Sequence, residues 1–306
     1  MRVSILKINN VRKSYGNNQV LKGINLNFEK PGIKALIGPN GSGKTTLFSI
    51  IVNLLKKDSG EILIQGMDHK DPKIFKKVSF LKDSSVLYGY LTGLDHLEFI
   101  AYAQGLPSSR IDEVCQKTGI TNYVKKKVST YSLGMKQHLL LAMVIMNKPK
   151  LMILDEPLNG LDPTAIIKTR GLLQELAEEG TAILLSSHTL TEVDYITSDI
   201  LFLSKGKIIN EDISVYKAID YEFLLDKKSL GKAKTILSKE KNVTLKKDKL
   251  IYRTETTDIQ NFIAYLTSNG IEFKEINKRK IGAEERYRAI FAEELSTERT
   301  GEGDIV

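Results

Sequence analysis

The stretch GPNGSGKTT, at residues 38–46, decides the fold of this chain. It matches the phosphate-binding pattern G-x-x-x-x-G-K-[ST], a loop that connects a strand to a helix. An apolar run at residues 33–37 precedes it, and apolar residues with helical spacing follow at 47–51. This context distinguishes the stretch from an ordinary glycine-rich turn, because inward backbone N–H groups and the helix N-terminus then attract a phosphate. Lys44 is expected to reach the β- and γ-phosphates, and Thr45 to ligate Mg²⁺.

The composition is that of an ordinary globular protein of about two domains. The chain has 306 residues, of which 42% are apolar and 27% charged. No apolar run approaches the roughly 18–20 residues that cross a bilayer, and the N-terminus lacks the pattern of a secretory signal. The single cysteine, Cys115, excludes an intrachain disulfide and fits a reducing compartment. A net charge of +8 permits nucleic acid, anionic lipid or nucleotide as partners and selects none of them.

Two further apolar strands are predicted to end in polar residues. Residues 151–154 lead into Asp155 and Glu156, a costly position for two charges unless they act at the strand's end. Ligands bind at that end in open α/β sheets. Asp155 is therefore expected to hold Mg²⁺ or its water, and Glu156 to orient or deprotonate an attacking water. The strand at 181–187 leads into His188, which either contacts the γ-phosphate or this water or has no special role.

Two weaker signals remain open on the residues alone. Ser132 and Gly134 precede an apolar helix, where they either cap the helix or offer a hydroxyl and free N–H groups to an anion. Tyr15 precedes a turn in a strand-rich stretch, where it either packs on the sheet or stacks on a nucleobase. The residues alone favour packing for Tyr15.

The pattern along the chain predicts two domains. The first spans residues 1–215 and contains a helical subdomain at about 84–145. From 216 to 295 the order β-α-β-β-α-β indicates a small ferredoxin-like domain, in which nothing looks catalytic. Its last helix is marked by the apolar residues Tyr287, Ile290, Phe291 and Leu295, and the polar tail at 296–306 is predicted to be disordered.

Taken together, these motifs resemble the ATP-binding subunit of an ABC transporter over roughly residues 3–215. The matching segments are Walker A at 38–46, Walker B at 151–156, the D-loop at 159–162 and the switch histidine at His188, while SLGMK at 132–136 stands where the family has its signature LSGGQ. The resemblance implies an α/β fold, a P-loop NTPase of the ABC type, with a mixed sheet core, an N-terminal antiparallel β layer and a helical subdomain. The small C-terminal α+β domain is additional to it.

The resemblance also implies roles for individual residues. The implied ATP-binding residues are Tyr15, Val20, Asn40, Gly41, Ser42, Gly43, Lys44, Thr45 and Thr46, with Tyr15 stacking on adenine. Glu156 would be the catalytic base and His188 the γ-phosphate sensor, with Mg²⁺ held by Thr45 and Asp155.

The implied assembly is a dimer of two such subunits facing head to tail. The signature residues Ser132, Leu133, Gly134 and Met135 of one subunit, flanked by Asp162 of the D-loop, would cover the ATP of the other. The second subunit is either a second copy or another ABC ATPase. Separate transmembrane permease subunits would hold the chain on the cytoplasmic face of the membrane, and nucleic acid is not expected as a partner.

Three positions depart from the family pattern. Lys82-Asp83 stands where the Q-loop glutamine is expected, and Asp83 can still reach Mg²⁺ although it is shorter and charged. Leu133 replaces the first signature glycine, with Met135-Lys136 beyond it, and His138 replaces the usual arginine. Because Lys44 and the Walker B carboxylates are kept, an active ATPase is expected. The signature variant looks like that of bacterial exporters of drugs, bacteriocins and lantibiotics.

Three other functions are alternatives to the exporter. A soluble ABC-type ATPase acting on ribosomes carries two cassettes in one chain, and one acting on DNA is split by a long coiled coil; neither feature is present in the sequence. A regulatory module that binds ATP without turnover is disfavoured by Glu156. An ABC importer ATPase remains an alternative, because the signature variant and the added C-terminal domain only favour export.

Overall fold

The computed structural model divides the chain into two compact units, Met1–Asp212 and Ile213–Val306. The structure describes residues 3–215, 219–237, 240, 242–255, 259–280 and 282–292. Along the chain, the division between the units falls close to residue 215, where the sequence predicts a domain boundary. The division into two domains stays a prediction. Among the described residues, no helix is long and apolar enough to cross a membrane.

A six-stranded sheet forms the centre of the first unit, in the order β10-β9-β3-β8-β7-β6. Its strands are β3 (Gly32–Ile37), β6 (Val78–Leu81), β7 (Leu151–Leu154), β8 (Ala182–Ser186), β9 (Asp199–Ser204) and β10 (Lys207–Asp212). All neighbouring pairs are parallel except β9 and β10, which form an antiparallel hairpin. The residues of β7 and β8 are buried throughout, as expected for central strands covered on both faces.

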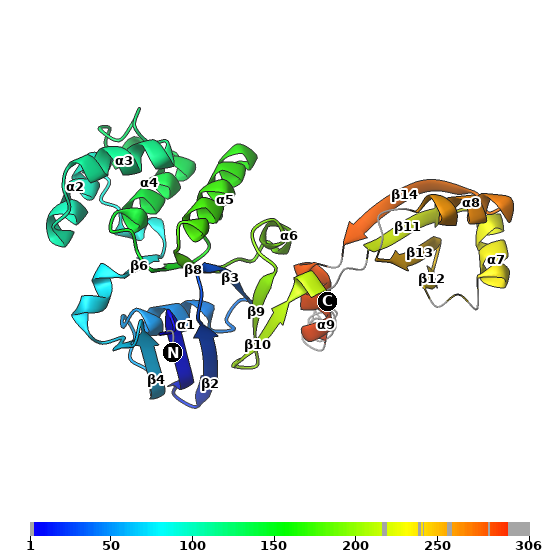
Figure 1. Cartoon of the computed structure of the whole chain (residues 1–306), viewed down its shortest axis with the longest axis horizontal. Coiled ribbons are helices and arrows are strands. Elements are labelled where there is room, and N and C mark those ends of the chain that lie inside the picture. The colour runs from blue at the N-terminus through cyan, green and yellow to red at the C-terminus, as the bar shows by residue number, and fades with distance from the viewer. Residues whose placement is uncertain are drawn as a thin grey trace, which may run out of the picture. The chain divides into compact units, whose positions relative to one another are not determined.

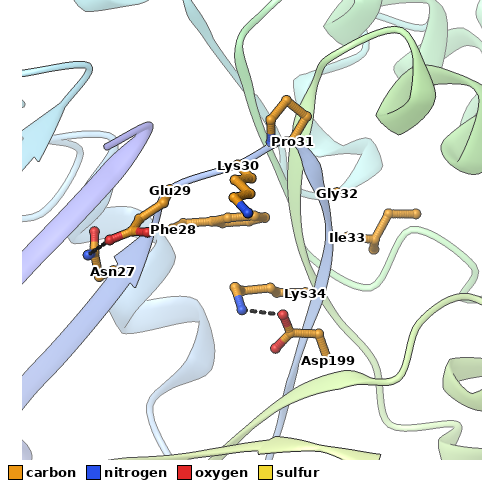
Figure 2. A pocket seen from close by; sticks show the side chains of 9 residues that line it. All are labelled: Asn27, Phe28, Glu29, Lys30, Pro31, Gly32, Ile33, Lys34 and Asp199. Carbon is orange, nitrogen blue, oxygen red and sulfur yellow. Dashed lines mark hydrogen bonds and ion pairs between the residues drawn. The ribbon is translucent and has the colours of Figure 1, made fainter. Parts of the chain in front are cut away.

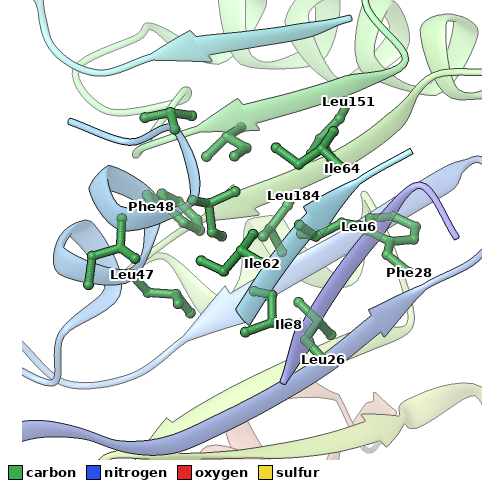
Figure 3. Packing of buried hydrophobic residues seen from close by; sticks show 14 of the residues in the cluster. Leu6, Ile8, Leu26, Phe28, Leu47, Phe48, Ile62, Ile64, Leu151 and Leu184 are labelled. Carbon is green, nitrogen blue, oxygen red and sulfur yellow. The ribbon is translucent and has the colours of Figure 1, made fainter. Parts of the chain in front are cut away.

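A second, antiparallel sheet in the order β2-β1-β4-β5 packs against this centre. It contains β1 (Leu6–Tyr15), β2 (Asn18–Phe28), β4 (Ser59–Ile64) and β5 (Met67–Asp68). Figure 3 shows Leu6 and Ile8 of this sheet beside Phe48 of helix α1 (Lys44–Ile51) and Leu184 of β8. Helix α1 and both sheets therefore share one core, which fixes the helix that begins at Lys44 against the central strands.

The helices of the first unit fall into two sets, one packed together as a helical group and one associated with the central sheet. Helices α2 (Gly93–Gln104), α3 (Ser109–Thr118) and α4 (Leu133–Ile145) pack on one another, as Figure 1 shows. Helix α5 (Pro163–Glu178) packs on β3 and β8, and α6 (Leu190–Asp194) follows β8. Short 3₁₀ turns lie at η1 (Pro72–Lys76), η2 (Ser84–Val86), η3 (Val128–Thr130) and η4 (Ile213–Val215), the last belonging to the second unit.

The second unit has the predicted ferredoxin-like arrangement. The elements run β11 (Ile219–Leu225), α7 (Lys227–Ile236), β12 (Val243–Lys246), β13 (Lys249–Thr254), α8 (Gln260–Ser268) and β14 (Phe273–Lys280). The strands form an antiparallel sheet in the order β12-β13-β11-β14, with a core around Phe223. This confirms the β-α-β-β-α-β order.

The end of the second unit differs slightly from the prediction. The alternation of apolar and polar residues that predicts the last strand starts at Ile271, but the strand begins at Phe273, because the Ile271 N–H donates to the Leu266 carbonyl and closes α8. Helix α9 (Ala283–Ile290) lies in the predicted last helix, while Leu295 and the tail at 296–306 lie outside the described residues.

A buried arginine joins α3 to the end of α4. Arg110 donates from Nε to the Met146 carbonyl at 2.8 Å and from Nη2 to the Ile145 carbonyl at 2.5 Å, and it pairs with Glu113. It thus satisfies carbonyls at a helix C-terminus that have no intrahelical partner.

We expect Arg110→Ala to lower the free energy of unfolding by about 2–4 kcal/mol, since the Met146 carbonyl loses its bond from Nε and the Ile145 carbonyl keeps only its bond from the Lys148 N–H. Urea denaturation measures the change. The control is Lys148→Gln, because Lys148 also pairs with Glu113 but is 70% exposed and should cost within about 0.5 kcal/mol. Equal costs for the two variants would contradict the role given to the arginine.

Candidate nucleotide-binding site

The loop between β3 and α1 needs its glycines for conformation and for space. Gly41 and Gly43 have φ values of +78° and +105°, which side chains with a Cβ rarely adopt. A Cβ added at Gly43 would also come within 2.7 Å of Val20 Cγ1. The backbone can therefore take this path only with glycine at Gly43, where α1 begins.

Lys44 and Ser42 present the polar groups of this loop. Lys44 Nζ donates to the Gly38 carbonyl at 2.7 Å and to the Pro39 carbonyl at 3.2 Å. Burial lowers the pKa of Lys44, while the carboxylates of Glu156 and Asp155 act in the opposite direction. Ser42 Oγ is buried and has no hydrogen-bond partner within the described part of the chain. An unsatisfied buried hydroxyl beside a cation is the arrangement that a phosphate oxygen would complete.

The carboxylates at the end of β7 face the loop. Thr45 Oγ1 donates to Asp155 Oδ2 at 2.7 Å, which brings together the two oxygens predicted to hold Mg²⁺. The other oxygen, Asp155 Oδ1, accepts from Ser186 Oγ at 2.6 Å. The sequence alone predicts no role for Ser186. The one feature that could indicate a role is its position at the polar end of an apolar strand.

Glu156 and His188 lie together beside Asp155. His188 Nδ1 is 2.8 Å from Glu156 Oε2, and the His188 N–H donates to the same oxygen at 3.2 Å. Glu156 has a φ of +52°, a left-handed conformation that is strained for a residue with a Cβ. The side chain of His188 is 54% exposed and that of Glu156 is 28% exposed, so both remain accessible from solvent.

The phosphate loop and the two carboxylates, Asp155 and Glu156, border an open cavity of about 560 Å³. Its lining residues are Tyr15, Val20, Asn40, Gly41, Gly43, Lys44, Thr45, Thr46, Lys82, Asp83, Asp155, Glu156 and Asn159. Most of the predicted ATP-binding residues thus surround one space, whereas Ser42, His188 and the signature residues do not line it. Asn159 also lines the cavity, whereas the sequence places it only in the D-loop match.

The structure bears on two lining residues, Tyr15 and Asp83, whose roles the sequence leaves open. Tyr15 is 50% exposed and faces the cavity, and Lys13 Nζ lies 5.4 Å from the centre of its ring. An exposed ring at the cavity leaves a face available for stacking. Asp83 Oδ1 accepts from the Ser85 N–H at 2.8 Å, and hydrogen bonds from the hydroxyl and amide of Ser85 lower the pKa of Asp83. It therefore presents a charged carboxylate at neutral pH.

A second cavity, of about 360 Å³, lies at the other end of β3, and none of its lining residues had been predicted as a site. Figure 2 shows Lys34 and Asp199 side by side in its lining, where they form an ion pair. Lys34 Nζ also lies 5.3 Å from the centre of the Phe28 ring. This ion pair neutralises one of the two lysines that line the cavity, the other being Lys30.

The signature residues lie at the start of α4, outside the cavity. Ser132 Oγ accepts from the Met135 N–H at 3.2 Å and caps α4, and Asp162 Oδ1 caps α5 by accepting from Ala165 N–H at 3.0 Å. Leu133 is 53% exposed. Ser132 therefore caps α4, as one of its two interpretations predicts, and its side chain is exposed.

Two leucines and two glycines interlock between the signature and the D-loop. A Cβ added at Gly160, whose φ is +72°, would overlap the side chain of Leu133. Reciprocally, Leu161 Cδ2 would lie 3.7 Å from a Cβ at Gly134. The start of α4 and the segment after Glu156 are consequently in direct contact within one subunit.

The strand–loop–helix with its buried lysine, facing a Thr45–Asp155 pair, defines a P-loop nucleotide-binding ATPase fold. The family profile described as ABC transporter matches residues 21–159. The chain belongs to the family of ABC transporter ATP-binding proteins, which are ATPases that hydrolyse ATP for transport, and it binds ATP.

Known relatives support this membership. The uncharacterized ABC transporter ATP-binding protein YdbJ of Bacillus subtilis (strain 168) is 42% identical over 212 residues, which are 68% of this chain and 69% of YdbJ. The lantibiotic transport ATP-binding protein SrtF of Streptococcus pyogenes is 40% identical over 207 residues, 68% of this chain and 90% of SrtF. A solved ATP binding subunit of an ABC transporter superposes with a TM-score of 0.65 at 26% identity, covering 70% of this chain and 92% of that one.

We expect Gly160→Ala to destabilise the protein more than Gly119→Ala. Both glycines have φ near +70°, but nothing lies within 4 Å of a Cβ at Gly119. The left-handed backbone should cost each variant about 1–2 kcal/mol, and displacement of Leu133 should add about 1 kcal/mol at Gly160. Urea unfolding measures both. The excess should shrink when Leu133→Ala is added, and an excess unchanged by that second substitution would contradict the interlock.

Proposed function

We propose that this chain is the ATP-hydrolysing subunit of an exporter for a peptide, antibiotic or drug-like substrate. The main observation in its favour is the Thr45–Asp155 contact with Glu156 and His188 beside it, at the mouth of the phosphate loop. The export direction is supported by the departure of the signature at Leu133 and by the relative SrtF, whose name refers to lantibiotic transport.

The residues present fit Mg²⁺ and ATP. Thr45 and Asp155 would hold Mg²⁺ through hard oxygen atoms, and Asp83 is a further carboxylate at the same cavity. When bound, Mg²⁺ neutralises the negative charge that develops on the phosphates during transfer. Lys44 would bind the β- and γ-phosphates, and the partnerless Ser42 hydroxyl would donate to a phosphate oxygen. Glu156 would orient the attacking water, and His188 would hold Glu156 and sense the γ-phosphate.

The proposed working form is a head-to-tail dimer with the same chain or another ABC ATPase. This accounts for the signature residues, which lie outside the cavity of their own subunit. Ser132 and Gly134, at the N-terminus of α4, would offer a hydroxyl and N–H groups to the γ-phosphate of the partner's ATP. Tyr15 would stack on adenine.

A second surface is proposed to bind the transmembrane permease subunits with which ATP-binding subunits of this family pair. An apolar groove of about 300 Å³ lies between β6 and the helices α2 and α4, and Leu54 and Phe75 in its lining are 67% and 45% exposed. Exposed apolar surface of this kind marks an interaction site. Lys82 lines both this groove and the nucleotide cavity, so permease binding and ATP would act on the same segment.

We expect Glu156→Gln to lower turnover by at least about 100-fold, because the water loses its base. ATP binding should persist, and nucleotide should promote a dimer, both measurable by equilibrium binding and gel filtration. Lys44→Ala should instead weaken ATP binding by roughly 10–100-fold through loss of a charge-assisted contact. Near-normal hydrolysis in the Glu156 variant would refute its role.

We expect Leu54→Glu to reduce copurification with coexpressed transmembrane permease subunits by at least about tenfold, since a buried unpaired charge at an interface is costly. ATPase activity of the isolated chain should not change. Ile209→Glu is the matched control, because Ile209 is also an exposed apolar residue, 41% accessible, but lies on β10. Normal copurification of the Leu54 variant would reject the groove as the docking surface.

A further inference from the structure

We propose that Ser186 is a positioning residue for both carboxylates of the site, setting the rotation of Asp155 and the backbone of Glu156. The inference rests on the proposed function in one respect, the assignment of these carboxylates to Mg²⁺ and to the attacking water. Ser186 is the last residue of β8 and is fully buried, so it acts through the two carboxylates and has no access to nucleotide.

The first contact fixes the plane of the Asp155 carboxylate. Ser186 Oγ donates to Oδ1 at 2.6 Å, while Oδ2 accepts from Thr45 Oγ1 at 2.7 Å. A carboxylate with only one partner can rotate about its Cβ–Cγ bond, because that torsion is broad. With a buried donor behind it, Asp155 keeps Oδ2 directed at Thr45 and the cavity.

The second contact fixes the backbone of Glu156. Its N–H donates to the same Ser186 Oγ at 2.9 Å, and Glu156 has the strained φ of +52°. Such a conformation persists only where surrounding contacts hold it. A hydroxyl donates one hydrogen and accepts others, so Ser186 serves both carboxylate residues at once. Neither alanine nor an acceptor-only side chain can do this.

Strand register explains why this position meets both residues. Leu154 of β7 pairs with Leu185 of β8, so the next residues on each strand, Asp155 and Ser186, lie side by side. On its other side Ser186 pairs with Leu36 of β3, just before the phosphate loop. Ser187 is also buried, but its hydroxyl accepts from the Thr189 N–H at 3.1 Å instead. Ser187 is therefore a matched control with no contact to the carboxylates.

The test compares Ser186→Ala, Ser186→Thr and Ser187→Ala with the unmodified chain. Mn²⁺ replaces Mg²⁺ as the spectroscopic probe, because both prefer octahedral oxygen sites. Electron paramagnetic resonance measures Mn²⁺ affinity of the protein–ADP complex, steady-state assays give kcat and KM for ATP, and a fluorescent ATP analogue reports binding without metal. Thermal melting shows that each variant is folded.

We expect Ser186→Ala to weaken Mn²⁺ affinity by roughly 10–100-fold, the usual effect of removing a group that orients a metal ligand. The kcat should fall by at least as much, while metal-free nucleotide binding stays within about twofold. Ser186→Thr should restore both, since it keeps the hydroxyl, and Ser187→Ala should change neither.

Unchanged Mn²⁺ affinity in Ser186→Ala would overturn the proposal. An equal loss in Ser187→Ala, or no recovery in Ser186→Thr at an unchanged melting temperature, would also overturn it, because the effect would then belong to packing. Absence of ATPase activity in the unmodified chain would refute the proposed function instead, and the Mn²⁺ measurement would still decide the role of Ser186.

Discussion

The placement of two adjacent carboxylates at the end of a buried strand is the constraint on which the rest of the structure depends. Strand β7 is inaccessible along its whole length, so Asp155 and Glu156 emerge from an apolar layer where unpaired charge is costly. Each is compensated by an element from elsewhere in the chain: Thr45 from α1, and Ser186 and His188 from the end of β8. The strand order of the central sheet brings these partners to the same edge as the carboxylates.

The order of strands also sets the electrostatics of the loop. Strand β8 is hydrogen-bonded between β3 and β7, so the phosphate loop after β3 and the carboxylates after β7 are separated by one strand. Lys44 is then buried close to negative charge, which offsets part of the penalty for burying a cation. Its ammonium is held meanwhile by the carbonyls of Gly38 and Pro39. A nucleotide phosphate would therefore enter a site whose cation is already fixed in position.

Sequence patterns predicted the fold well because its signals are local. The phosphate loop, the apolar strands with polar ends and the βαββαβ order of the second unit all follow from neighbours along the chain. The role of Ser186 could not be foreseen, since it depends on the register between β7 and β8, over thirty residues apart in sequence. The same holds for Leu133 and Gly160, whose contact forms only after α4 and the segment following Glu156 meet. In the second unit, Ile271 alternates like a strand residue but forms the turn that closes α8.

The signature segment and Glu156 are joined within the chain by direct contacts. Gln137 of α4 donates to the Pro157 carbonyl at 2.7 Å, directly after Glu156, and Leu133 packs on Gly160 a few residues later. Close-packed contacts transmit a shift rather than absorbing it. In the proposed dimer, a change at Glu156 in one site would therefore move the signature that covers the other site. Leu133, which stands where the family has a glycine, adds its contact with Gly160, so in the proposed dimer this link would be stronger than it would be with a glycine.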